Sequence, residues 1–179
     1  MPFAYYDRLS PARQRIYRKS DAIEALLLPP GRDLGAEVAL IREGLARDDV
    51  AAVRKASQQV IDALVAGFRV PRIRVRVLAT RPADGGGELH GLYEPEDGTT
   101  PARITVWMRT AQRRQVVAFR TFLRTLVHEL CHHLDYEMFE LPETFHTEGF
   151  YKRESTLAAA LFAQVDAARA ESPARRSPG

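Results

Sequence analysis

The segment from Thr125 to Glu140, TLVHELCHHLDYEMFE, constrains the fold most because it combines helical periodicity with a cluster of imidazoles. In an α-helix, residues four apart are rotated by only about 40°, and their Cβ atoms lie roughly 5–6 Å apart. His128 and His132 therefore direct both rings toward one point, within reach of the bonds of about 2.0–2.1 Å that imidazole makes to zinc. We expect a long helix with these two side chains on one face.

Glu129 lies one step round this helix, beside the expected metal position. A carboxylate there can accept a proton from a water molecule whose pKa a metal ion lowers to about 7. Two histidines and a glutamate at H-E-x-x-H spacing form the signature of a zinc-hydrolase helix. The pattern predicts Zn²⁺ as the cofactor, His128 and His132 as ligands, and Glu129 as the general base.

The other polar residues of the segment have different expected roles. Cys131 is expected to be a buried, inert thiol. His133 is rotated by about 100° from His132 and is expected to pack or to form a hydrogen bond inside the fold. Asp135 lies on the same face as His128, seven residues later, where its carboxylate either orients a ligand imidazole or is simply exposed.

A catalytic zinc ion needs a third protein ligand and an open position for water. In the metzincin pattern a glycine and a further histidine follow the second histidine at fixed steps, and this chain has Asp135 and Met138 there instead. The metzincin class is therefore excluded. His146 and Glu154 both lie downstream, and the residue pattern alone leaves the choice between them open.

The rest of the chain predicts an α+β domain with N-terminal helices, a small antiparallel or mixed sheet, a long active-site helix and a C-terminal helix. We expect one domain over residues 1–170, with a helical part (1–68) and a part that holds the sheet and the catalytic helices (69–170). Residues 171–179 are expected to be disordered. Helices are expected at 10–30, 35–46, 48–67, 111–139 and 150–170, and strands at 71–80, 88–95 and 103–109.

Composition limits the partners and the compartment. The single cysteine cannot form an internal disulfide, and no apolar stretch is long enough for a signal peptide or a membrane span, so we expect a cytoplasmic protein without a membrane partner. The net charge is only +3. Arg72, Arg74 and Arg76 alternate with apolar residues, as on a solvated strand face or a strip that contacts nucleic acid.

Two segments together, LVHELCHHLDYEMF and HTEGFYKRE, resemble the SprT-like zinc metalloprotease domain, which includes the Spartan proteases. That family pairs H-E-x-x-H with a later histidine in an H-G-x-x-F-like element. His146 and Phe150 match the ends of this element, and Thr147 replaces the usual glycine. The resemblance covers roughly residues 104–154. It implies His146 as the third ligand, a compact zincin fold and metallopeptidase activity, whereas a single cysteine cannot build the zinc ribbon of the family's tail.

The expected function is therefore zinc-dependent hydrolysis of peptide bonds, with Glu129 as the general base. Tyr136 or Tyr151 is expected to donate a hydrogen bond to the oxyanion, or only to pack. An extended peptide substrate is expected to pair with the strand Arg103–Arg109. Two alternatives stay open: hydrolysis of a small amide, and a DNA-associated binding module with a zincin fold.

Overall fold

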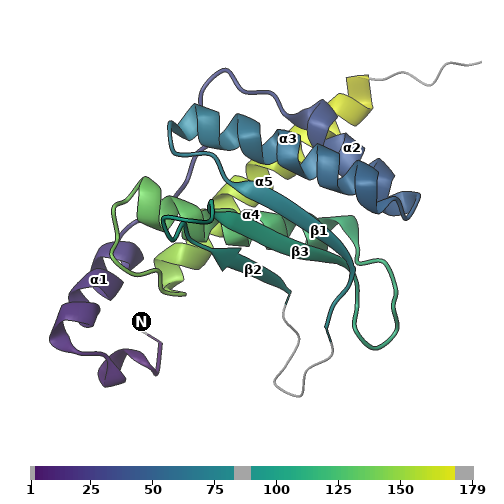
Figure 1. Cartoon of the computed structure of the whole chain (residues 1–179). Helices are drawn as coiled ribbons and strands as arrows, with labels where there is room; N and C mark the ends of the chain where they lie inside the picture. Colours follow the sequence, from purple (N-terminus) through teal and green to yellow (C-terminus); the bar gives the residue numbers. More distant parts are fainter. Residues whose placement is uncertain (1–2, 83–89, 172–179) are drawn as a thin grey trace, which may run out of the picture.

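The computed structural model describes residues 3–82 and 90–171 (Figure 1). These ranges form an α+β domain with five α-helices and a three-stranded mixed sheet, which agrees with the predicted fold class. In chain order the elements are η1 (Tyr6–Arg8), α1 (Pro11–Asp21), α2 (Gly35–Ala46), α3 (Val50–Phe68), β1 (Arg74–Thr80), β2 (Gly91–Glu94), β3 (Arg103–Arg109), α4 (Phe119–Glu137) and α5 (Glu148–Glu171). The tail predicted to be disordered lies outside the described residues from 172 onward.

The sheet has the order β1-β3-β2 (Figure 1). β1 runs parallel to β3 over most of its length, and β2 runs antiparallel to the first half of β3. The end of β3 is also covered, because Arg109 forms an isolated bridge with Val116. The prediction that a peptide pairs with Arg103–Arg109 is therefore wrong, since this strand already has a neighbour on each side.

Both faces of β3 are buried. Ile104, Val106 and Met108 lie on one face, and Thr105 and Trp107 on the other face are buried as well. The pairings with β1 and β2 place this strand in the middle of the sheet. β1 and β2 are consequently the two edge strands of the described sheet.

A side chain from α3 occupies the start of the β1 edge. The amide of Gln58 donates a 3.0 Å hydrogen bond to the carbonyl of Ile73 and accepts a 2.8 Å hydrogen bond from the backbone N–H of Val75. These are the two bonds that a residue of a neighbouring strand would make. The Gln58 amide thus takes the place of a fourth strand at this point.

Two predicted helices are shorter than expected. The helix predicted over 111–139 begins at Phe119, because the preceding residues turn back along β3, where Val117 donates a backbone hydrogen bond to Met108. The helix expected at 10–30 is α1, which Ser10 caps and Pro11 begins, but α1 ends at Asp21. There Arg153 donates to the carbonyl of Ser20, which the next helical turn would otherwise use.

Helix α4 carries the predicted site and packs against both β3 and α5. Its apolar face belongs to the main core, through Phe122, Leu123, Leu126, Val127, Leu130 and Leu134. Burial of this stripe holds the helix in place, so the histidines on its other side have a rigid support. Among the described residues, no helix combines the length and the apolar character that crossing a membrane requires.

Candidate metal centre

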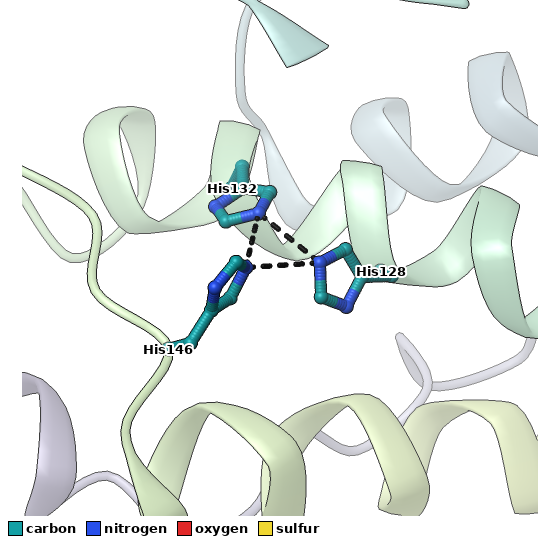
Figure 2. Close-up of side chains that lie close together, drawn as sticks. All are labelled: His128, His132 and His146. Atoms are coloured by element: carbon teal, nitrogen blue, oxygen red, sulfur yellow. Dashed lines mark hydrogen bonds between the residues drawn. The ribbon is translucent and has the colours of Figure 1, made fainter. Parts of the chain in front are cut away.

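Three imidazole rings converge between α4 and the segment before α5 (Figure 2). The Nε2 atoms of His128, His132 and His146 form a triangle with sides of 3.0 Å, 3.1 Å and 3.3 Å. Three ligands at tetrahedral angles around zinc, with bonds of about 2.0–2.1 Å, place their nitrogens roughly 3.3 Å apart. The triangle thus fits one small metal ion, and it is the one such cluster of His, Cys, Asp and Glu found in the described ranges.

The far side of the His128 ring contacts Glu154. The Nδ1 atom lies 2.9 Å from a carboxylate oxygen, which can only accept, so Nδ1 carries the proton. In the neutral ring Nε2 then holds a lone pair that points into the triangle. Glu154 therefore lies behind a histidine of the triangle rather than within it, and its other oxygen is 3.5 Å from Arg124. The alternative that placed Glu154 in the ligand set has no support from this arrangement.

A second chain of hydrogen bonds sets the tautomer of His132. The hydroxyl of Thr144 donates to Asp135 over 2.8 Å, so its oxygen accepts the Nδ1 proton of His132, also over 2.8 Å. The Nε2 atom of His132 consequently presents a lone pair as well. Asp135 thus reaches His132 through Thr144, whose role no pattern in the sequence indicates, and the orientation of a metal ligand by Asp135 stays a prediction.

With these tautomers, hydrogen bonds among the three rings cannot satisfy all three Nε2 atoms. His128 and His132 both present lone pairs, 3.3 Å apart, so no hydrogen bond can join those two nitrogens. His146 can donate to at most one of them. Burial also lowers the pKa of His132 to about 3, which keeps this ring neutral near pH 7. A cation at the centre would satisfy all three nitrogens, so these residues fit the Zn²⁺ that the motif predicts.

Asp135 is part of a fully buried ion pair. Its other carboxylate oxygen lies 2.7 Å from the guanidinium of Arg153, and neither side chain is more than 1% exposed. Arg153 also donates to the carbonyls of Ser20, in the last turn of α1, and Ile23, just after this helix. Both terminal nitrogens of the guanidinium are thus bonded, whereas its buried Nε has no partner among the described residues. Loss of Asp135 would leave a buried charge unpaired, which costs about 3–5 kcal/mol. The pair therefore links α1, α4 and α5 behind the triangle.

Glu129 lies on α4 next to strand β2. A Cβ atom at Gly91 would be only 2.4 Å from Oε1 of Glu129, so the strand approaches this carboxylate without a side chain in between. Burial raises the pKa of Glu129 to about 7, while the electrostatic effect of the nearby His128 and a backbone hydrogen bond from Tyr93 oppose the increase. A carboxyl with this pKa can both accept and release a proton near neutral pH.

A cavity of ≈ 440 Å³ opens beside Glu129 and His128. His90 and Gly91 form one wall, and Arg120 and Arg124 of α4 also line it. This volume falls within the range of ligand sites, about 300–1,000 Å³. From the sequence alone His90 is incidental, since one histidine before a short strand carries no spacing signal.

The two tyrosines suggested for the oxyanion lie in different surroundings. The ring of Tyr151 is half-exposed and stacks on His146, with 5.8 Å between the centroids. Tyr136 instead stacks on Tyr93 at 5.9 Å. Tyr93 itself is engaged, because its hydroxyl lies 3.2 Å from Nδ1 of His133. Tyr151 is therefore the better placed of the two predicted residues.

The predictions for Cys131 and His133 agree with the structure where they concern burial. Cys131 is buried, and the loss of hydration raises the pKa of its thiol. His133 is fully buried, and its Nε2 lies 2.9 Å from the carbonyl of Pro71. Neither side chain belongs to the metal-sized cluster.

The three arginines that were predicted to form a strip line a separate cavity of ≈ 560 Å³. Arg72, Arg74 and Arg76 line it together with Arg54 of α3 and Arg103 of β3, two arginines that lie far from the strip in the sequence. Arg72 is paired with Asp62, and Arg103 with Glu94.

No model of a known protein family, no curated protein and no solved structure matches this chain. The geometry of the site and the chemistry of its residues therefore carry the functional argument.

Proposed function

We propose that the protein is a zinc-dependent metallopeptidase that hydrolyses peptide bonds in proteins or peptides. The observation that carries this proposal is the triangle of His128, His132 and His146, with lone pairs directed inward, next to the buried carboxylate of Glu129. A structural zinc site usually fills all four positions with protein groups. Here three candidate protein ligands converge within residues 3–82 and 90–171, and a base lies alongside them.

The proposed roles of the residues follow from their positions. His128, His132 and His146 would hold the ion, which when bound supplies a Lewis acid for the scissile carbonyl and the attacking water. Glu129 accepts a proton from that water as the water oxygen bonds to the carbonyl carbon. The same carboxyl then delivers the proton to the amide nitrogen as the carbon–nitrogen bond breaks. The hydroxyl of Tyr151 donates to the carbonyl oxygen as negative charge develops there.

We place the substrate backbone along β2 rather than β3. β2 is an edge strand, and its first residue, Gly91, lines the cavity that Glu129 and His128 share. An extended peptide added to this edge would run past the base, with its backbone held by strand pairing. This arrangement favours a polypeptide over a small amide, because a small amide gains nothing from a sheet edge.

The test is digestion of an unbiased peptide library by the zinc-loaded protein, read by mass spectrometry. Glu129→Gln is the matched control, because glutamine keeps the shape of the side chain but cannot accept the proton. We expect cleavage by the wild type only, with equal zinc content in both proteins. Equal cleavage by both would exclude Glu129 as the base, and hydrolysis restricted to small amides would favour the alternative substrate class.

A second candidate function rests on the arginine-lined cavity. Arg54, Arg74 and Arg76 have no acidic partner among the described residues, so their charges are available to an anion. A polyanion such as a nucleic acid backbone is the ligand that such a cluster favours. This would make the protein a DNA-associated module, either together with the peptidase activity or in place of it.

A further inference from the structure

A third cavity, of ≈ 530 Å³, borders His146 on the side of the N-terminal segment. Its described lining consists of Phe3, Ala4, Tyr5, Arg8, His146 and Tyr151. The cavity is distinct from the one beside Glu129, with which it shares no lining residue. A group bound in it would nevertheless lie next to a proposed metal ligand and to Tyr151.

The walls of this cavity are aromatic and supported by one another. The ring of Phe3 stacks on that of Tyr5, with 6.3 Å between the centroids. It also contacts the ring of Tyr151 edge-on, with 6.1 Å between the centroids. Phe3 and Tyr151 are also 40% and 42% exposed, which is unusual for large rings within a packed cluster. Rigid aromatic surfaces bind apolar groups with little loss of conformational entropy, so these faces are suited to a large apolar side chain.

The remaining polar feature of the cavity is Arg8, at the end of η1. Its side chain is exposed, and it has no ion-pair partner within residues 3–82 and 90–171. No acidic side chain belongs to the described lining. A guanidinium with free donors matches the geometry of a carboxylate, with which it forms paired hydrogen bonds.

We propose that this cavity is the specificity subsite of the enzyme, and that it binds a large apolar side chain of the substrate together with an adjacent carboxylate on Arg8. The inference rests on the proposed peptidase function, because only a substrate held at the histidine triangle would extend into it. The carboxylate has two sources in a peptide: an Asp or Glu side chain, or the free C-terminus. The N-terminal segment thereby selects the substrate.

The experiment compares four peptide substrates that share one cleavable sequence with a phenylalanine. In the first pair the phenylalanine lies in the middle of the peptide, and the residue beside it is Glu in one member and Gln in the other. In the second pair the phenylalanine is the last residue, and the C-terminus is a free acid in one member and an amide in the other. We expect the wild type to prefer the carboxylate-bearing member of one pair by about fivefold in kcat/KM, the effect of one exposed ion pair. The pair that shows the preference identifies the source of the carboxylate.

Arg8→Glu should abolish or reverse that preference, whereas Arg15→Glu makes the same charge change at an exposed position of α1 outside the cavity and should retain it. The same ranking should appear in the affinity of metal-free Glu129→Gln protein for the four peptides, measured by fluorescence anisotropy. If cleavage occurs without preference, or Arg8→Glu behaves like Arg15→Glu, the subsite is excluded and the peptidase remains. If no peptide is cleaved or bound, both proposals fail.

Discussion

The hydroxyl of Tyr5 donates a 2.8 Å hydrogen bond to the backbone carbonyl of His146, across 141 residues of sequence. His146 comes from the segment that precedes α5, whereas His128 and His132 share the rigid turns of α4. The hydrogen bond from the N-terminal segment therefore holds the one histidine of the three that lies outside a helix.

Tyr5→Phe should weaken zinc binding without unfolding the protein. The change removes one hydrogen bond worth about 0.5–1.5 kcal/mol and leaves the ring contacts in place. We expect a roughly three- to tenfold increase in the zinc dissociation constant, measured by competition with a chelating dye. Tyr6→Phe is the control, because the Tyr6 hydroxyl contacts Arg18 instead. Equal affinities for both variants would show that the bond to His146 has no role.

His146→Ala and Glu154→Ala decide which residue completes the ligand set. Loss of His146 removes one of three converging nitrogens, so stoichiometric zinc binding should disappear. Loss of Glu154 removes the acceptor behind His128 and should weaken binding by about 10–100-fold, the usual effect of a group that orients a ligand. Zinc titration into each metal-free variant makes the measurement. The reverse order of effects would assign the third ligand to Glu154.

Thr144→Val tests the chain of hydrogen bonds behind His132. Valine retains the shape of threonine, but the Nδ1 proton of His132 loses its acceptor and Asp135 loses a donor. Zinc affinity should fall by about 10–100-fold. Thr156→Val on α5, whose hydroxyl bonds only to the carbonyl of Lys152, should leave affinity unchanged. A Thr144→Val protein with wild-type affinity would show that the tautomer of His132 is set in another way.

Gly91→Ala should displace Glu129 and reduce catalysis. The added methyl group would lie 2.4 Å from Oε1 and 2.8 Å from Cγ of Glu129, and 2.8 Å from Cγ2 of Thr125, so both side chains of α4 must shift. We expect a lower melting temperature than that of the wild type, because the contact is overpacked, together with retained zinc and a large decrease in kcat. Calorimetry, metal analysis and peptide cleavage measure the three quantities. Unchanged kcat would argue that Glu129 does not act from its position beside β2.

Binding of DNA through the arginine-lined cavity should depend strongly on salt. If Arg54, Arg74 and Arg76 bind phosphates, each arginine replaced by alanine should reduce the slope of log K against log salt by about one. Titration of a labelled oligonucleotide at several salt concentrations, with wild type and the triple alanine variant, measures this slope. Equal slopes for both proteins would exclude the cavity as a phosphate site.

Local patterns predicted those features that depend on neighbouring residues. The i, i+4 spacing of His128 and His132 depends on a single turn of helix, and both residues lie on α4 in the structure. The central position of β3 could not be derived in this way, because it depends on which strands pair with it. Thr144 and Arg153 were missed for the same reason: their roles arise from contacts between segments that the sequence keeps apart.

The Gln58 amide that covers the start of β1 also limits how copies of the protein can associate. A sheet with two open edges can join further sheets end to end, but Gln58 blocks such pairing at the start of β1, and β2 is the other edge strand of the described sheet. A second copy that paired with β2 would lie over Gly91 and close the cavity beside Glu129. Pairing of two copies through β2 would therefore exclude a peptide from the same edge.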